Sequence, residues 1–81
     1  SEDDCFDKYG VYPKQFIDYQ SLLGDSADNV PGVKGVGAKT AQALISQFNT
    51  LENIYENIDK IEKPRWQKLL LEGKEMAFIS K

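Results

Sequence analysis

Apolar residues recur along this chain at the spacing of helices, and no stretch shows the sustained alternation that is typical of a strand. The clearest pattern predicts a helix over residues 38–48, because four apolar positions there stand at i, i+3, i+4 and i+7. These positions are Ala41, Leu44, Ile45 and Phe48. The chain is therefore predicted to be all-α, a small bundle of about five short helices. The other four helices are expected over residues 13–23, 51–58, 64–72 and 74–80.

Four residues indicate where these helices begin and end. Pro13 and Pro64 suit the first turn of a helix, where a missing amide costs nothing. Thr50 is a typical N-cap, and Gly73 is a typical end. Aromatic and aliphatic side chains at helical spacing belong to a core more often than to a base-stacking surface. The predicted core contains Phe16, Leu44, Ile45, Phe48, Ile54, Tyr55, Trp66 and Leu69.

Length and composition limit what the chain can do. Its 81 residues, 41% of them hydrophobic, suffice for one small domain but not for a large enclosed active site. One cysteine and no histidine exclude an internal disulfide, a zinc finger and a histidine-dependent catalytic triad, and fit a reducing compartment such as the cytoplasm. The sequence has no membrane-spanning run or leader peptide and begins with Ser1, so we expect a soluble fragment of a longer protein.

Charge is distributed unevenly, although the net charge is only −3. Residues 1–28 contain seven acids and two lysines, whereas residues 29–51 contain two lysines and no acid. A polyanion should therefore approach residues 29–51, since clustered charge sets the local potential. Residues 1–7 are acidic and lack periodicity, so we expect a flexible acidic terminus there and a helical domain over residues 8–81.

The acid-free segment contains a glycine-rich turn. Gly32, Gly35 and Gly37 permit a tight turn directly before the predicted helix and let a ligand approach the backbone. The unpaired amides at the start of that helix suit a phosphate, and Lys34 and Lys39 add positive charge. A hairpin of this kind between two helices can hold a DNA backbone without reading bases. The alternative is an ordinary glycine-rich connection.

Two nucleotide-binding motifs do not fit this turn. A P-loop needs adjacent Gly and Lys before Ser or Thr, whereas Ala38 separates Gly37 from Lys39, and no strand precedes the turn. The dinucleotide pattern G-x-G-x-x-G requires a third glycine where Thr40 stands.

Two aspartates precede the turn. Asp25 and Asp28 are three residues apart, so in a helical turn both carboxylates would project from one side and could share a divalent cation. Mg²⁺ or Mn²⁺ suits such hard oxygen ligands, and Mg²⁺ commonly takes only one or two protein carboxylates together with substrate phosphate. The alternative is that these aspartates only cap a helix or form a turn.

Residues 24–41, GDSADNVPGVKGVGAKTA, resemble the helix-three-turn-helix signature of the bacterial and phage 5′ to 3′ exonucleases, a part of the flap endonuclease superfamily. The flanking segments DKYGVYPKQFIDYQSLL and TLENIYENIDKI resemble the 5′-nuclease region at the N-terminus of bacterial DNA polymerase I. The resemblance extends from about residue 7 to the end of the chain. It implies the C-terminal helical subdomain of a nuclease that cuts 5′ flaps or degrades 5′ ends during DNA replication and repair.

The resemblance also implies roles for individual residues. Asp25 and Asp28 match the family's carboxylates at the second site of a two-metal centre, whose other ligands come from an upstream α/β catalytic domain of the same polypeptide. The hairpin is implied to bind the backbone of duplex DNA with a 5′ flap or 5′ end, in relatives often with a bound K⁺. The implied DNA-binding residues are Gly32, Val33, Lys34, Gly35, Val36, Gly37, Lys39 and Thr40.

These implications lead to a divided expectation. The parent protein is a metal-dependent nuclease, whereas this chain alone is a monomer that binds DNA and cleaves nothing. Two other functions stay open from the residues themselves. One is a helix-hairpin-helix DNA-binding module without nuclease activity, and the other is a helical protein-interaction domain, which the acidity and the aromatic residues suggest.

Overall fold

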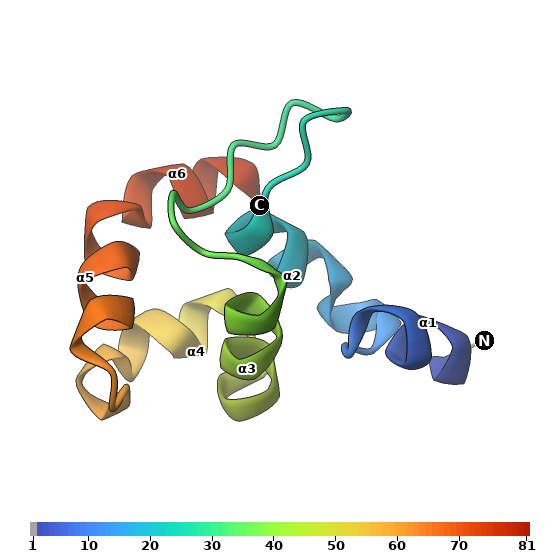
Figure 1. Cartoon of the computed structure of the whole chain (residues 1–81), viewed down its shortest axis with the longest axis horizontal. Helices are drawn as coiled ribbons and strands as arrows, with labels where there is room; N and C mark the ends of the chain where they lie inside the picture. Colours follow the sequence, from blue (N-terminus) through green and yellow to red (C-terminus); the bar gives the residue numbers. More distant parts are fainter. Residues whose placement is uncertain (1) are drawn as a thin grey trace.

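The computed structural model describes residues 2–81, which form α-helices joined by short turns (Figure 1). In chain order the elements are α1 Glu2–Tyr9, the 3₁₀ turn η1 Pro13–Gln15, α2 Phe16–Leu23, α3 Ala38–Phe48, α4 Leu51–Glu56, the 3₁₀ turn η2 Ile58–Lys60, α5 Pro64–Glu72 and α6 Lys74–Ser80. Strand pairing in this part of the chain is limited to one isolated bridge between Asp25 and Val30. The predicted all-α class is confirmed. Within the described range, no helix combines the length and the apolar character needed to cross a bilayer.

Local sequence signals account for the helix boundaries that were predicted correctly. α3 has the predicted bounds, and the Thr50 hydroxyl caps α4 by accepting a hydrogen bond from the Asn53 amide at 3.1 Å. Pro64 is the first residue of α5, and Gly73 separates α5 from α6. Each of these signals acts within one helical turn, so the sequence alone reveals them.

Two predicted helices are shorter than expected. Pro13 opens the 3₁₀ turn η1, and the α-helix starts only at Phe16. The helix predicted over residues 51–58 ends at Glu56, because the Asn57 side chain donates a hydrogen bond to the Asn53 carbonyl at 2.8 Å and the backbone leaves the helical conformation there. The chain continues as η2.

Residues 1–7 were predicted to form a flexible acidic terminus, but the structure places α1 over Glu2–Tyr9, while residue 1 lies outside the described range. Aromatic contacts explain this difference. The Phe6 ring stacks on the Tyr12 ring at 4.8 Å between centroids, and the Tyr9 ring meets the Phe16 ring edge-on at 4.9 Å. These contacts hold α1 against the residues that follow it, and no local pattern within residues 1–7 indicates them.

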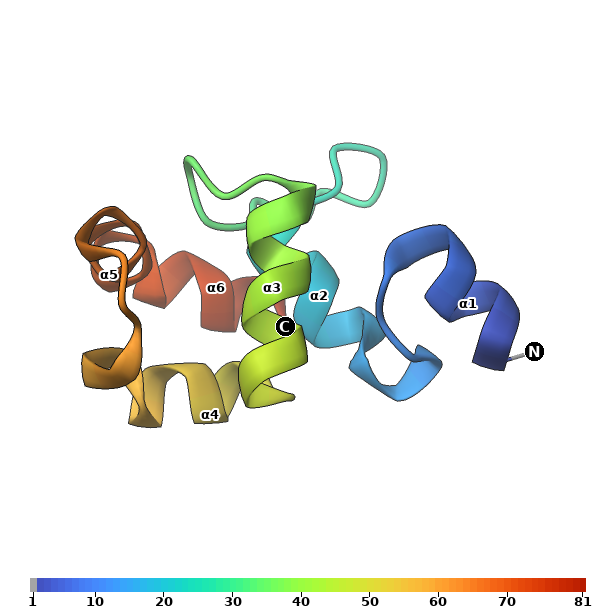
Figure 2. The ribbon, with the colours of Figure 1, turned by 60° about the horizontal axis from the view of Figure 1, so that its bottom comes forward.

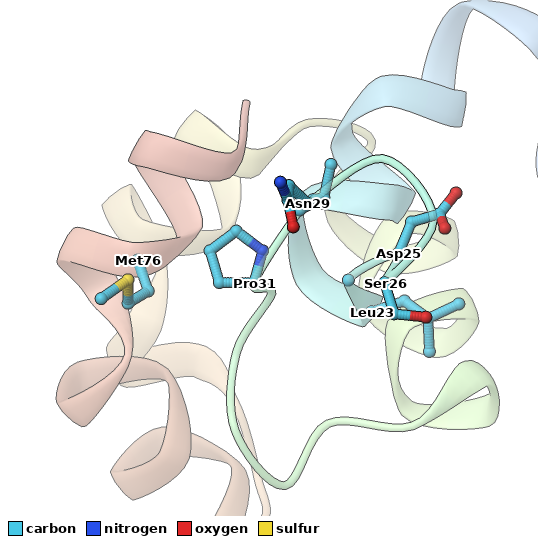
Figure 3. Close-up of a pocket in the computed structure, with 8 residues that line it drawn as sticks. Leu23, Asp25, Ser26, Asn29, Pro31 and Met76 are labelled. Atoms are coloured by element: carbon cyan, nitrogen blue, oxygen red, sulfur yellow. The ribbon is translucent and has the colours of Figure 1, made fainter.

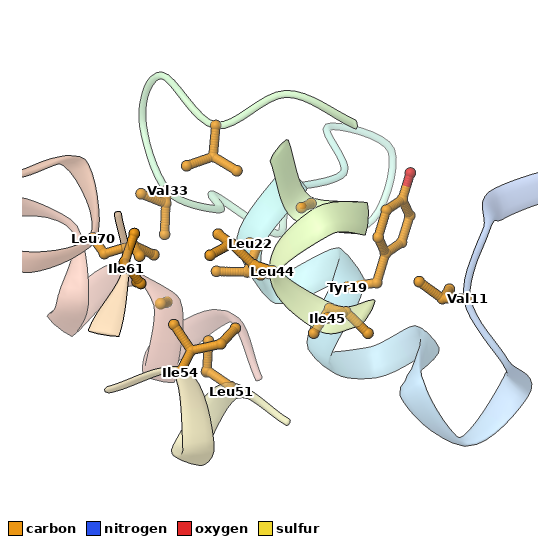
Figure 4. Close-up of a cluster of buried hydrophobic side chains, with 13 residues drawn as sticks. Val11, Tyr19, Leu22, Val33, Leu44, Ile45, Leu51, Ile54, Ile61 and Leu70 are labelled. Atoms are coloured by element: carbon orange, nitrogen blue, oxygen red, sulfur yellow. The ribbon is translucent and has the colours of Figure 1, made fainter. Parts of the chain in front are cut away.

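The hydrophobic core is built around α2, which packs on α3, α4 and α6 (Figure 4). Of the predicted core residues, Leu44, Ile45 and Ile54 are buried. The others are half-buried against the core, namely Phe16, Phe48, Tyr55, Trp66 and Leu69. The core also contains Val11, Tyr19, Leu22, Val33, Val36, Ala41, Leu51, Ile61, Leu70 and Ala77. Two of these valines come from the connection between α2 and α3, so that connection is part of the packed structure.

Candidate nucleic-acid interface

The connection between α2 and α3 consists of two successive turns. The first, residues 25–30, is called here the carboxylate loop. It is closed by reciprocal main-chain hydrogen bonds of 2.8 and 2.9 Å between Asp25 and Val30. The second, residues 32–37, is called the glycine turn. It is tightened by the Val36 amide, which donates to the Val33 carbonyl at 3.1 Å. The carboxylate loop projects beyond the helices in Figure 1, and Figure 2 shows the glycine turn leading into α3.

Two glycines of the glycine turn have a backbone geometry that favours glycine. Gly32 has a φ of 69° and Gly35 a φ of 88°, in the left-handed region where a side chain causes strain. Gly32 has no space for a Cβ, and a Cβ on Gly35 would require the Leu69 side chain to move. A Cβ on Gly32 would lie 2.5 Å from the Gly24 nitrogen, and one on Gly35 would lie 2.9 Å from Leu69 Cδ2.

The glycine turn rests on α5 and α6. Gly35 lies against Leu69, and Gly73 leaves the space that Val33 fills, because a Cβ on Gly73 would come within 2.7 Å of Val33 Cγ1. The Gly32 amide donates to the Ser80 hydroxyl at 3.0 Å. Helices at the far end of the chain therefore support the turn from beneath.

The N-terminal end of α3 faces outward without a side-chain cap. Gly37 is the N-cap residue, and the first hydrogen bond of the helix runs from the Ala41 amide to the Gly37 carbonyl at 3.0 Å. Within residues 2–81, no protein acceptor is recorded for the amides of Ala38, Lys39 and Thr40. These amides and the helix dipole make this end suitable for an anion.

The side chains and amides of Val33 and Val36, two of the predicted DNA-binding residues, are used within the protein. Their side chains are 3% and 6% exposed and belong to the core, as Figure 4 shows for Val33. The Val33 amide donates to the Leu22 carbonyl at 2.8 Å, and the Val36 amide closes the turn. Gly32 is buried and its amide is also used. The predicted DNA-binding residues that lie at the surface are Lys34, Gly35, Gly37, Lys39 and Thr40. The valines instead fasten the turn to the core.

The two predicted lysines are available for an anion. Lys34 and Lys39 are exposed, and no ion pair is recorded for either in the described part of the chain. A third cation, Arg65 in the first turn of α5, lies beside Lys34 and Gly35 at the same surface hollow. No signal in the sequence places Arg65 at the glycine turn. Arg65 is about thirty residues from the turn, and only the packing of Leu69 on Gly35 brings the two together.

Asp25 and Asp28 lie in a turn between α2 and α3 and not on a helix, so their spacing of three does not by itself align their carboxylates. Residues 26–29 are a non-helical turn, in which one Asp25 carboxylate oxygen accepts from the Ala27 amide at 3.0 Å. The other oxygen accepts from the Gln20 side-chain amide at 3.3 Å. Asp28 is exposed, and the structure records no hydrogen bond or ion pair for it within residues 2–81. Asp25 is thus held in place, whereas Asp28 faces solvent.

The carboxylates fit part of a metal site. Across the described residues, no group of three or more Asp, Glu, Cys or His side chains is arranged to hold a metal ion. The hydrogen bonds to Asp25 leave lone pairs on both carboxylate oxygens for a cation. Mg²⁺ is often bound through only one or two protein carboxylates. Two aspartates can therefore contribute to a centre whose remaining ligands come from elsewhere.

A shallow hollow lies between the carboxylate loop and α6. Figure 3 shows Met76 on one side and Asp25 and Ser26 on the other, with Pro31 between them and the Asp25 carboxylate pointing away from Met76. Met76 is 50% exposed. The sequence did not indicate this apolar surface beside Asp25, because α6 and the carboxylate loop are far apart in the sequence and become neighbours only in the folded chain.

Comparison with known proteins identifies the family. The model of the family described as "5′-3′ exonuclease, C-terminal SAM fold" matches residues 11–81. The chain belongs to this 5′-3′ exonuclease family. The resemblance found in the sequence is thereby confirmed, and the bundle of short helices around α2 and α3 is the C-terminal fold of the family.

Related 5′-3′ exonuclease domains occur both in polymerases and in shorter proteins. DNA polymerase I of Caldicellulosiruptor bescii is 52% identical over 75 residues, which are 93% of this chain and 9% of that protein. A 5′-3′ exonuclease of Buchnera aphidicola is 55% identical over 56 residues, which are 69% of this chain and 20% of that protein. The chain thus spans only a small part of the relatives that it matches.

A solved structure supports the same assignment. T5 5′-exonuclease, in a structure with bound zinc ions, superimposes with a TM-score of 0.74 at 30% identity over 95% of this chain and 29% of that protein. The family fold therefore extends over nearly the whole described chain.

Proposed function

We propose that this chain is the DNA-backbone-binding subdomain of a structure-specific 5′ to 3′ exonuclease, with the glycine turn and the start of α3 as its contact surface. The observation that carries the proposal is the exposed, uncapped N-terminus of α3 beside two lysines for which no ion pair is recorded in the described chain. Membership of the 5′-3′ exonuclease family makes a nucleic acid the expected anion.

The proposed contact does not depend on base sequence. Main-chain amides at the start of α3 and the Lys34 and Lys39 ammonium groups can donate to phosphate oxygens, which are the same at every base pair. Binding then releases counterions, and the logarithm of the affinity falls by about 0.9 per neutralised phosphate against the logarithm of salt concentration. The sequence resemblance implies a duplex with a 5′ flap or 5′ end, which is the proposed substrate.

Asp25 and Asp28 are proposed as ligands of a divalent metal in the complete enzyme. The structure of T5 5′-exonuclease with bound zinc ions supports a metal dependence in the family. Here we infer Mg²⁺ or Mn²⁺, shared with carboxylates of an N-terminal catalytic domain, because two aspartates are too few for a complete site. Asp25 and Asp28 would hold such a metal, which when bound would supply Lewis-acid chemistry for phosphodiester hydrolysis. Main-chain carbonyls of the glycine turn are the proposed site for K⁺.

The wider function follows from the parent polypeptide. Because DNA polymerase I is among the relatives with the highest identity, we infer that the parent is a bacterial DNA polymerase I or a free-standing exonuclease acting in DNA replication and repair. In that protein the chain holds the DNA as a monomeric unit in the cytoplasm, and the catalytic domain cuts it. The isolated chain is proposed to bind DNA without cleaving it.

Affinity measurements at low salt test the proposed surface. Lys34→Ala and Lys39→Ala should each weaken binding of a duplex by about 3–10-fold and make binding less salt-dependent. Lys14→Ala is the matched control, since Lys14 is exposed on η1, and η1 is joined through Gln15 to Asn49 at the C-terminal end of α3, opposite the proposed contact surface. Equal effects of all three substitutions would contradict the proposal, because net charge and not the glycine turn would then determine affinity.

A non-catalytic helix-hairpin-helix module is the second candidate. The hydrogen bond from the Ala27 amide to Asp25 favours it, because that aspartate already shapes a turn. Paramagnetic Mn²⁺ distinguishes the two functions. We expect it to broaden amide signals around Asp25 and Asp28 more than those of α1. Broadening confined to the acidic residues of α1 would support the second candidate.

A further inference from the structure

A surface hollow joins the glycine turn to α5. It has a volume of about 490 Å³, and its lining combines two residues of the turn with one face and the end of α5. These residues are Lys34, Gly35, Arg65, Leu69, Glu72 and Gly73. The proposed contact surface therefore continues from the glycine turn onto a helix that the sequence resemblance did not assign to DNA.

Helix geometry fixes Arg65 at this place. Leu69 lies directly beneath the turn, because its Cδ2 atom would be 2.9 Å from a Cβ on Gly35. Arg65 is four residues earlier in α5, so it lies one turn along on the same face. Arg65 is exposed, and no ion pair is recorded for it among residues 2–81. Its guanidinium is thus free to meet an anion beside Lys34.

The charges of the hollow favour an anion at one end. Lys34 and Arg65 bring two positive charges, while Glu72, seven residues after Arg65, lies two helical turns away at the C-terminal end of α5. A guanidinium can give two parallel hydrogen bonds to the oxygens of one phosphate, and an ammonium adds a point charge. One phosphodiester suits this pair of side chains.

We propose that Arg65 and Lys34 form a second phosphate-binding site, which takes a DNA phosphodiester next to the one held at the start of α3. The inference rests on the proposed function and extends its DNA contact from one turn to two elements. Because α5 supports the turn through Leu69 and Gly73, the two sites keep a fixed separation. Arg65 positions the backbone and reads no base.

The test measures the affinity of the 81-residue chain for a labelled duplex at several salt concentrations. Arg65→Ala should weaken binding by about 3–10-fold and reduce the salt slope by about one phosphate. Arg65→Lys keeps the charge and should retain the slope while losing part of the affinity. Glu72→Gln should strengthen binding by about 2-fold, since it removes the carboxylate of the same hollow. Lys14→Ala serves again as the control for net charge.

Coupling between the two cations makes the test specific. If Lys34 and Arg65 hold one phosphate, Lys34→Ala should cost less in the Arg65→Ala background than in the wild-type chain. An Arg65→Ala effect equal to that of Lys14→Ala, with Lys34→Ala and Lys39→Ala still weakening binding, would overturn the second site and leave the proposed function intact. If every lysine and arginine variant binds DNA as tightly as the wild-type chain, the proposed function itself is overturned. Unchanged amide spectra of the free variants confirm that the fold is kept.

Discussion

Gly35 and Gly37 stand two residues apart in the glycine turn but serve different purposes. Gly35 combines a φ of 88° with contact to Leu69, so both its conformation and its packing exclude a side chain. Gly37 has an extended backbone, and a Cβ there would meet nothing within 4 Å. Gly35 is therefore a requirement of folding. Gly37 leaves open the surface at the uncapped end of α3.

Alanine substitutions should separate these two roles. Gly35→Ala should lower the free energy of unfolding by about 2–4 kcal/mol, because it adds left-handed strain and forces Leu69 aside. Gly37→Ala should cost at most about 1 kcal/mol, the difference between the two residues at an N-cap. It should still weaken DNA binding, since its methyl group obstructs the amides. Urea unfolding of both variants gives the comparison, and similar stability losses would contradict it.

At the residue scale the sequence predicted that the glycines form a turn and that the lysines place positive charge there. It did not predict that the side chains of Val33 and Val36 point into the core. Glycine spacing is a local signal for a turn, and an isolated lysine is almost always exposed. Val33 and Val36 are three residues apart, but they lie in a glycine-rich turn and not in a helix, so this spacing does not indicate which way their side chains point. Their burial depends on Gly73 and the other residues beneath the turn, which lie more than thirty positions later.

At the element scale a buried carboxylate on α2 connects three segments. Asp18 is 5% exposed, and one of its oxygens accepts from the Leu51 amide at the start of α4 at 2.8 Å. Its other oxygen lies 3.0 Å from the Lys81 ammonium, which also donates to Glu52 at 2.8 and 2.9 Å. The Leu51 amide is one of the helix-start donors that need a partner, so Asp18 satisfies it from a different helix.

Replacement of Asp18 should loosen α4. Asp18→Ala leaves the Leu51 amide buried without an acceptor and should lower the free energy of unfolding by about 1–3 kcal/mol. Asp18→Asn keeps an acceptor oxygen and loses only the ion pair, so its loss should be smaller. Hydrogen exchange of the α4 amides measures the local effect. Equal protection in the wild-type and Asp18→Ala chains would show that the buried hydrogen bond does not hold α4.

Helix boundaries were largely predictable because Pro64, Thr50 and Gly73 act on their own helices. α1 was not predictable from the sequence, since it is held by contacts of Phe6 with Tyr12 and of Tyr9 with Phe16, which lie outside the helix. The link from Asp18 to Leu51 spans 33 residues and has no sequence signature. The spacing of three between Asp25 and Asp28 would align their carboxylates only in a helical turn, whereas the Asp25 to Val30 bridge closes the carboxylate loop as a non-helical turn.

At the scale of the whole molecule, burial of Tyr55 makes the free energy of unfolding depend on pH. Its hydroxyl donates to the Leu70 carbonyl at 2.7 Å, and burial raises the pKa of Tyr55 to about 12. The folded pKa is higher than the unfolded value of about 10, so folding favours the protonated phenol. Its contribution to stability is complete below pH 10 and is lost as the pH rises from about 10 through 12.

The unfolding free energy should therefore fall above pH 10 and fall less steeply in Tyr55→Phe. Urea titrations between about pH 8 and pH 11 measure this slope. Tyr12→Phe is the matched control, because Tyr12 is 43% exposed. A Tyr55→Phe chain whose alkaline decline equals that of the wild type would contradict this role, and would assign the decline to other groups such as Lys81, whose pKa is raised mainly by its hydrogen bond to Glu52.

The family and the proposed contact surface at the glycine turn could be predicted from the sequence, because the residues of GDSADNVPGVKGVGAKTA are contiguous. The part of the surface contributed by Arg65 was not, since it depends on how α5 packs beneath the turn. The same reasoning applies to the metal centre. Asp25 and Asp28 are visible in the sequence, but their proposed partners belong to a domain that this chain does not contain.

The most direct test of the central claim is an amide map of the ¹⁵N-labelled chain titrated with duplex DNA at low salt. Changes should centre on residues 34–40, should be the same for two duplexes of unrelated sequence, and should diminish between about 50 and 200 mM salt. Unchanged signals in residues 34–40, or changes confined to the exposed apolar face of α6, would contradict DNA-backbone binding by the glycine turn.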